Sequence, residues 1–150
     1  MSEHAVEIRE SIAEDIPGIF EVRTSVRDNH LDREQLAKLG ITPDSLASMM
    51  GATHGSWSAL VNDRLVGFSM SDRKSGLVEA LFVQPDQEGK GIGQALLQCA
   101  VQDLRQQGWE RIRLFTGADT GAYAFYTRRG WRATGKTKGG DVELVLVPGA

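Results

Sequence analysis

A glycine-rich turn carries the clearest chemical signal in this sequence. Three glycines alternate with other residues in E-G-K-G-I-G-Q, at positions 88–94. Without Cβ atoms the backbone can turn sharply there and approach a ligand closely. The mostly apolar run at 77–83 predicts a buried strand before the turn, and helical periodicity follows it to about residue 107. Free N–H groups at a helix start attract anions and Lys90 adds a full charge, so the turn predicts a phosphate site.

Two other phosphate-binding loops share the order strand, glycine turn, helix. A P-loop needs two glycines five residues apart followed by Lys and Ser or Thr, and the sequence contains no such run. The dinucleotide fingerprint G-x-G-x-x-G also fits poorly, because the glycines here are spaced G-x-G-x-G. A flexible loop before a purely structural helix is the remaining alternative.

A second constellation of residues lies about 30 positions further on. It reads D-x-x-A-x-x-F-Y-x-x-x-G-W from Asp119 to Trp131. Together the two segments resemble the GNAT superfamily of N-acetyltransferases, in which a strand, a Pro and a run close to R-G-x-G-I-G lead into a pyrophosphate-binding helix. The family usually has Gln or Arg where this chain has Glu88, and Asn and Phe where it has Asp119 and Trp131. The resemblance covers roughly residues 6–147, although 28–55 contribute almost nothing to it.

The resemblance implies that acetyl-CoA is the co-substrate and that no metal is needed. Backbone groups of the strand before the turn are then expected to bond the pantetheine arm, and those of the turn the pyrophosphate. The Glu88 side chain is expected to point outward, since a carboxylate beside a pyrophosphate is repulsive. The expected cofactor-binding residues are Leu81, Phe82, Val83, Glu88, Gly89, Lys90, Gly91, Ile92, Gly93, Gln94, Asp119 and Tyr126.

Tyr126 is the expected general acid. Acetyl transfer from a thioester to an amine expels a thiolate, which benefits from a nearby proton donor, and a phenol suits that role. The matching tyrosine in the GNAT family sits close to the CoA sulfur. The alternative is an ordinary buried tyrosine with a hydrogen bond to its hydroxyl.

Glu79 is the expected base, because an amine arrives as ammonium and must lose a proton before it attacks. It is a lone acid in an apolar strand, two residues before Leu81, and is therefore expected on the same face as Leu81. Burial there would make the carboxylate a stronger base. Some related acetyltransferases of small amines carry Glu at the equivalent place, whereas some ribosomal-protein acetyltransferases place it on the next strand, where this chain has Leu114. A salt bridge from Glu79 to a structural Arg is the alternative.

The acceptor site is the least readable part of the sequence. The family resemblance implies that the segment between the first two strands borders the acceptor, which would bring Arg27, Asp28, Asn29 and His30 near it; a solvated helix end is the alternative. The three histidines lack metal-ligand spacing. Cys99 lies on the apolar face of the helix after the turn, so direct transfer is expected rather than an acetyl-cysteine intermediate.

Periodicity and turn residues predict a single α/β domain over residues 1–150. Its sheet is expected to be mixed but mostly antiparallel, with six or seven strands and about four flanking helices, and the family resemblance implies a splayed central strand pair. Expected strands are 5–11, 57–61, 65–71, 77–83, 111–116, 131–135 and 142–147, and expected helices are 14–27, 43–51, 92–107 and 119–129.

Composition narrows the functional classes. The net charge of −3 argues against a nucleic-acid surface, and no apolar run is long enough to cross a membrane, so a cytoplasmic enzyme is expected. The expected reaction is N-acetylation of a primary amine, with a small molecule favoured over a peptide, and a homodimer is possible. A non-catalytic acyl-CoA-binding or sensing module on the same scaffold is the rival hypothesis.

Overall fold

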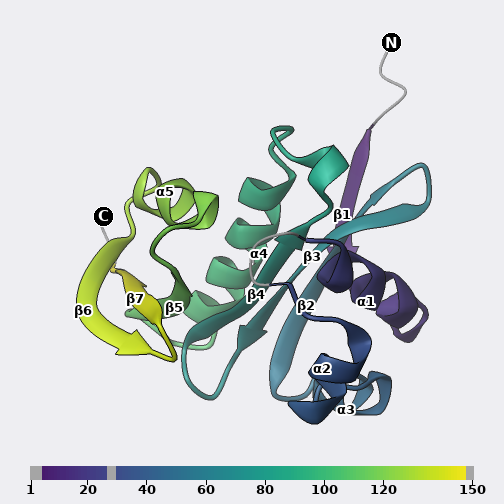
Figure 1. Ribbon diagram of the computed structural model, residues 1–150, viewed down its shortest axis with the longest axis horizontal. Coiled ribbons are helices and arrows are strands. Elements are labelled where there is room, and N and C mark those ends of the chain that lie inside the picture. The colour runs from purple at the N-terminus through teal and green to yellow at the C-terminus, as the bar shows by residue number, and fades with distance from the viewer. Residues whose placement is uncertain (1–4, 27–29, 148–150) are drawn as a thin grey trace.

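The computed structural model describes residues 5–26 and 30–147, which form one seven-stranded sheet in the order β1-β2-β3-β4-β5-β7-β6 (Figure 1). Its strands are β1 (Val6–Glu10), β2 (His54–Val61), β3 (Arg64–Asp72), β4 (Leu77–Val83), β5 (Ile112–Gly117), β6 (Arg132–Lys138) and β7 (Asp141–Leu146). Every neighbouring pair is antiparallel except β4 and β5, which run parallel. The predicted fold class is therefore confirmed.

The described residues contain five α-helices, one more than the sequence predicted. They are α1 (Ile16–Ser25), α2 (Arg33–Lys38), α3 (Pro43–Met49), α4 (Ile92–Gln106) and α5 (Gly121–Thr127), with short 3-10 turns η1 (Ala13–Asp15) and η2 (Pro85–Gln87). The unexpected helix is α2, which begins with a reciprocal cap. The Gln35 N–H donates to the Asp32 carboxylate at 2.8 Å, and the Asp32 N–H donates to the Gln35 side chain at 2.9 Å.

Helices cover both faces of the sheet. Helices α1, α2 and α3 bury their apolar side chains against Phe68 and Met70 of β3. On the opposite face α4 packs against the sheet through Leu96, Leu97 and other side chains of its apolar stripe. No helix in the described part of the chain is long and apolar enough to span a membrane.

Polar contacts also fix α4 to the sheet. The buried Ser69 hydroxyl donates to the Leu96 carbonyl at 2.9 Å, and the buried Ser71 hydroxyl donates to the Asp103 carboxylate at 2.7 Å. Both serines are on β3 and point toward the helix. These bonds set the position of α4 along the sheet, and with it the position of the glycine turn at its start.

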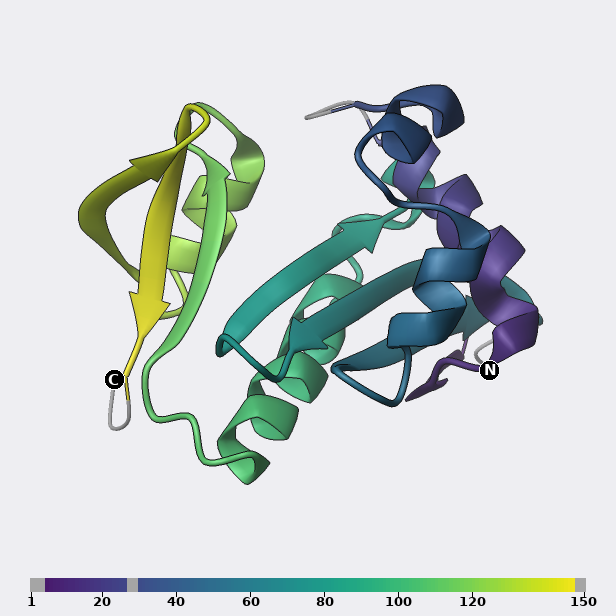
Figure 2. The same cartoon turned by 90° about the horizontal axis from the view of Figure 1, so that it is seen from below.

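The sheet divides between β4 and β5. Their only paired residues are Leu77 and Arg113, with the Arg113 N–H donating to the Gly76 carbonyl at 3.0 Å. Beyond this point the two strands part, and Figure 2 shows β5, β6 and β7 turned away from β1–β4. We call β1–β4 the N-terminal half-sheet and β5–β7 the C-terminal half-sheet. The splayed strand pair predicted from the sequence is therefore present, with one half-sheet on each side of it.

Candidate active site

The glycine turn forms an open cradle at the start of α4. Gly89 and Gly91 have φ values of 81° and 82°, in the left-handed region that glycine adopts without strain. Gly91 is the N-cap, and the first hydrogen bond of the helix runs from the Ala95 N–H to the Gly91 carbonyl at 3.1 Å. The N–H groups of Ile92, Gly93 and Gln94 consequently have no acceptor within the helix. They provide the donors that an anion would need.

Two cations border this cradle, and the sequence indicated only the first. Lys90 is exposed, with its Nζ 3.2 Å from the Gln87 side-chain oxygen. Arg129, which follows α5, hydrogen-bonds the Gln94 side chain and lies with its guanidinium 3.8 Å from the centre of the Phe125 ring. Nothing in the sequence linked position 129 to position 94. The Glu88 side chain is exposed, as expected, so its carboxylate is free to stay in water.

Helix α5 brings the second motif of the sequence against the first. A Cβ added to Gly93 would lie 3.6 Å from the Phe125 ring, so the two motifs are in close contact. Thr120 caps the helix by accepting the Tyr123 N–H at 3.3 Å, while its neighbour Asp119 is exposed. The C-terminal half-sheet is thereby connected to the cradle across the division in the sheet.

Tyr126 is buried in the core cluster that spans the division. It is 7% exposed and packs with Val78 of β4 and Leu97 of α4, with edge-to-face contacts to the rings of Phe125 and Trp131. No described residue forms a hydrogen bond with its hydroxyl. Burial raises the pKa of the Tyr126 phenol, so the hydroxyl keeps its proton at neutral pH.

The edge of β4 that faces the division carries main-chain groups without a strand partner. Leu81, Phe82 and Val83 pair with β3 on one side, whereas the pairing with β5 ends at Leu77. An extended chain could therefore bond to this free edge as an added strand.

Glu79 lies differently from the sequence-based expectation. Met70 pairs with Ala80 and Ser71 pairs with Val78, so Glu79 is an extra residue in a β-bulge. The bulge shifts the alternation of side chains: Leu81 packs toward α4, whereas Glu79 meets residues on the face covered by α1–α3. The predicted shared face of Glu79 and Leu81 is wrong. The predicted burial is also wrong, since the Glu79 side chain is 39% exposed.

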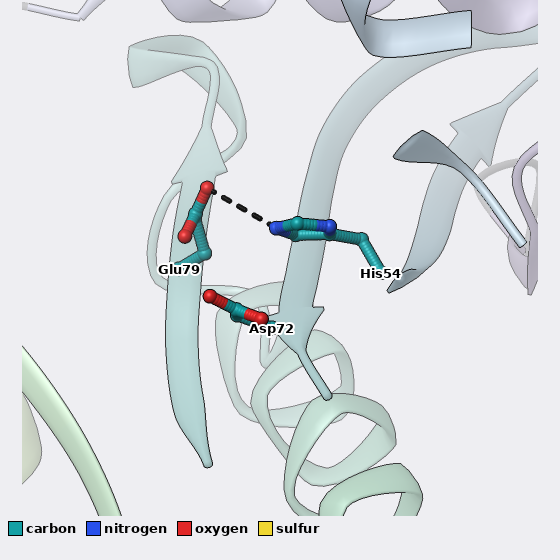
Figure 3. A group of neighbouring side chains, drawn as sticks. All are labelled: His54, Asp72 and Glu79. Atoms are coloured by element: carbon teal, nitrogen blue, oxygen red, sulfur yellow. Dashed lines mark ion pairs between the residues drawn. The ribbon is translucent and has the colours of Figure 1, made fainter. Parts of the chain in front are cut away.

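The neighbours of Glu79 in the cluster are His54 and Asp72, shown in Figure 3. The Glu79 carboxylate lies 3.5 Å from His54 Nε2, and no Arg within residues 5–26 and 30–147 forms a salt bridge with it. One ligating atom from each of these three residues lies within 4.8 Å of the others, so the cluster could hold a cation. Spacing along the sequence missed this group because its members come from three strands. The spacing of the histidines along the sequence therefore did not indicate that His54 lies beside two carboxylates.

The remaining candidates from the sequence were residues 27–30 and Cys99. Arg27, Asp28 and Asn29 are outside the described residues, and His30 is exposed with Nδ1 3.1 Å from the Val26 carbonyl. Cys99 is half-buried, and burial raises the pKa of its thiol. A protonated thiol is a poor nucleophile, which agrees with the expectation of direct transfer.

Comparison with known proteins identifies the class. The family model described as an acetyltransferase (GNAT) domain matches residues 23–142. The chain therefore belongs to the GNAT acetyltransferase family, and the class of enzyme expected from the sequence is confirmed at the level of the family.

Individual relatives agree with this class. The chain is 33% identical over 89 residues to an uncharacterised N-acetyltransferase of Methanocaldococcus jannaschii, which covers 53% of this chain and 39% of the relative. It is 39% identical over 74 residues to a mycothiol acetyltransferase of Propionibacterium freudenreichii, covering 45% of this chain and 24% of the relative. The matches thus span less than half the length of these curated relatives.

A solved structure matches almost the whole fold. The PaiA N-acetyltransferase of Thermoplasma acidophilum, in complex with coenzyme A, superimposes with a TM-score of 0.79 and 20% identity. The match covers 95% of this chain and 99% of that chain. At this identity it establishes the shared fold.

Proposed function

We propose that this protein transfers an acetyl group directly from acetyl-CoA to a primary amine of a small molecule. The observation that carries the proposal is the open cradle at the start of α4, beside the division of the sheet, with the second motif packed against it. Residues 1–150 would then act as one N-acetyltransferase domain. The structural neighbour with bound coenzyme A supports acetyl-CoA as the co-substrate.

In this proposal the coenzyme forms hydrogen bonds with main-chain groups at two places, the glycine turn and the free edge of β4. The pyrophosphate accepts hydrogen bonds from the N–H groups of 88–94, and Lys90 and Arg129 add positive charge beside it. The pantetheine arm extends along the free edge of Leu81, Phe82 and Val83. The thioester then lies in the division between β4 and β5. Asp119, exposed at the approach to α5, contributes to the coenzyme site from the other side.

Two side chains would then handle protons on either side of the thioester. Glu79 receives a proton from the acceptor's ammonium group, directly or through water, and Tyr126 donates one to the departing thiolate. The exposure of Glu79 supports its role, because the carboxylate remains accessible to a solute. The burial of Tyr126 supports its role as a donor that is protonated at neutral pH.

The segment between β1 and β2 supports a small acceptor over a peptide. Helices α1, α2 and α3 pack over one face of the N-terminal half-sheet with buried residues such as Leu36 and Leu46. This cover restricts the open groove over the sheet that an extended peptide would need. A cytoplasmic location and a homodimer stay predictions.

The decisive experiment is a coupled test of binding and turnover. We expect coenzyme A to bind in calorimetry and to raise the melting temperature of the protein. We expect acetyl-CoA to release free thiol in the presence of n-butylamine, 1,5-diaminopentane or glycinamide, and more slowly with a hexapeptide bearing a free α-amine. Binding without turnover of any amine would favour the sensing module. Absence of coenzyme A binding would refute the proposal.

A further inference from the structure

His54 is the most deeply buried member of the polar cluster beside Glu79. It is 8% exposed and begins β2, directly opposite Asp72 at the end of β3. Glu79 approaches from the bulge of β4, so three adjacent strands contribute one side chain each (Figure 3). Polar groups removed from water need defined partners, so the contacts of this buried imidazole show what it can do.

The imidazole has a polar neighbour at each of its nitrogen atoms. His54 Nδ1 lies 2.7 Å from the Thr53 hydroxyl, and Nε2 lies 3.5 Å from the Glu79 carboxylate. The ring therefore has a fixed orientation, with Nε2 directed at Glu79. Glu79 has no such constraint of its own, since it is 39% exposed and has three side-chain torsions. His54 is the rigid partner and Glu79 the adaptable one.

Asp72 makes the contact between His54 and Glu79 more important. Its carboxylate accepts the Lys74 N–H at 3.0 Å, which ties it into the turn between β3 and β4. Two carboxylates within 4.8 Å of each other repel, so the Glu79 carboxylate would turn toward solvent without its contact to His54 Nε2.

The helices that cover this face of the sheet also carry charged side chains. Arg23 of α1 lies over the Phe82 ring, 4.5 Å from its centre, and Asp44 of α3 is exposed in the first turn of its helix. One carboxylate oxygen each of Asp72 and Glu79 and one ring nitrogen of His54 lie within 4.8 Å of one another.

We propose that His54 is a positioning residue for acetyl transfer, which holds the Glu79 carboxylate beside the division between β4 and β5. This inference rests on the proposed function. The acceptor's ammonium gives one proton to Glu79, and the nitrogen lone pair attacks the thioester carbonyl carbon. The C–S bond then breaks with its electron pair on sulfur, which takes a proton from Tyr126. The nitrogen of the adduct then loses a second proton, which returns to Tyr126. The proton held by Glu79 leaves to solvent, so both side chains are restored.

Two conservative substitutions separate positioning from bulk stability. His54→Gln places an amide nitrogen near the position of Nε2 and keeps the contact with Glu79, whereas His54→Asn keeps the contact with Thr53 and loses the one with Glu79. We expect His54→Asn to lower kcat by at least about 10-fold with coenzyme A affinity unchanged, and His54→Gln to stay within about 3-fold of the wild type. Turnover is measured by thiol release with the best of the three small amines named above.

A double-mutant cycle tests whether His54 acts through Glu79. In a Glu79→Gln background, His54→Asn should cause almost no further loss, because the group that it positions has already gone. Ser56→Ala is the matched control: Ser56 is equally buried on β2 and donates to the Ser11 hydroxyl at 2.8 Å, away from Glu79. It should leave kcat within about 2-fold of the wild type.

Each contrary result has a clear meaning. The proposal would be overturned if His54→Gln lowered kcat as much as His54→Asn, or if His54→Asn kept full activity. It would also be overturned if the losses of kcat multiplied in the double mutant. An inactive wild type would instead overturn the proposed function itself. Removal of metals with a chelator should leave turnover unchanged; loss that Zn²⁺ restores would make His54 a metal ligand instead. If the His54 variants fail to fold, Thr53→Ala tests the same chain of contacts and should lower kcat by about 3-fold or more.

Discussion

The two sides of the divided sheet place their ionisable groups in opposite environments. On the N-terminal half-sheet Glu79 is 39% exposed and meets His54 and Asp72. Across the division Tyr126, in the helix beside the C-terminal half-sheet, is 7% exposed among aromatic and aliphatic side chains. Glu79 can therefore exchange protons with solvent, whereas the Tyr126 phenol is shielded from solvent.

This contrast suits two different tasks in one reaction. A base must lose the accepted proton again after each turnover, and contact with solvent and with other polar groups makes this easier. An acid must be protonated when the thiolate forms, and the Tyr126 phenol, whose pKa is raised by burial, is protonated at neutral pH. Ionisation of Tyr126 should therefore make no contribution to the pH dependence of turnover near neutrality.

Removing the buried acid should have the largest effect. Tyr126→Phe keeps the ring contacts with Phe125 and Trp131 but deletes the hydroxyl. We expect kcat to fall about 10²- to 10³-fold, the usual scale for a lost general acid, with coenzyme A affinity nearly unchanged. Thiol release and calorimetry measure the two quantities. Phe125→Leu is the control for packing, and unchanged turnover of Tyr126→Phe would contradict the assignment.

Removing the exposed base should cost less. Glu79→Gln keeps the shape of the side chain at the bulge but cannot accept the ammonium proton. We expect a loss of kcat of about 10- to 10²-fold, smaller than for Tyr126 because water can reach the same place and act as a weaker base. Raising the pH should restore part of the rate, since more acceptor is then already deprotonated. A loss independent of pH would show that Glu79 has a structural role.

The cradle offers a smaller effect on binding alone. Gly91 has a φ of 82° with no atom within 4 Å of an added Cβ, so Gly91→Ala strains the backbone without a clash. Relief of this strain, about 1–2 kcal/mol, would turn the N–H groups of the cradle away from the pyrophosphate. We therefore expect coenzyme A binding to weaken by about 5- to 30-fold. Calorimetry checks this.

Gly93→Ala is the matched comparison for Gly91→Ala. Its added Cβ would make only an ordinary contact with Phe125 at 3.6 Å. Ala also favours a helix over Gly, so Gly93→Ala should raise thermal stability where Gly91→Ala lowers it. Equal destabilisation by both substitutions would show that the left-handed turn is not what Gly91 supplies.

Much of the fold could be predicted from the sequence because it depends on local patterns. Apolar alternation predicted the strands, and the glycine turn with its following apolar stripe predicted α4. The expected mixed sheet is confirmed, because the crossover through α4 makes β5 a parallel neighbour of β4. The family resemblance then supplied the divided strand pair, because two motifs far apart in sequence had to meet at one site.

The arrangement around Glu79 could not be predicted, because it depends on pairing between strands. A bulge adds one residue to β4 without any Gly or Pro to mark it, and it moves Glu79 to the other face. The contacts to His54 and Asp72 depend on strand register, which spacing along one chain does not reveal. Arg129 could not be predicted either, because only the packing of α5 brings it to Gln94.

The smallest effect predicted concerns the joint that holds the two half-sheets. Arg113 is the residue of β5 that pairs with Leu77, and its guanidinium donates to the Glu143 carboxylate at 3.1 Å and to the Ser75 carbonyl at 3.0 Å. Glu143 is 2% exposed and also accepts from the Thr134 hydroxyl at 2.7 Å. The Thr134 hydrogen bond, followed by the Arg113 contact, lowers the pKa of Glu143.

A lowered pKa in the folded state means that the ionised Glu143 stabilises the protein above its ordinary value of 4.5, and that this contribution is lost as the pH falls through the folded pKa. Glu143→Gln should therefore lower the free energy of unfolding by about 1–2 kcal/mol near neutral pH, with kcat unchanged, and by less in acid. Thermal unfolding at both pH values measures this, with the exposed Glu110→Gln as control. An equal loss at both pH values would show that side-chain shape, rather than the charge on Glu143, holds the joint together.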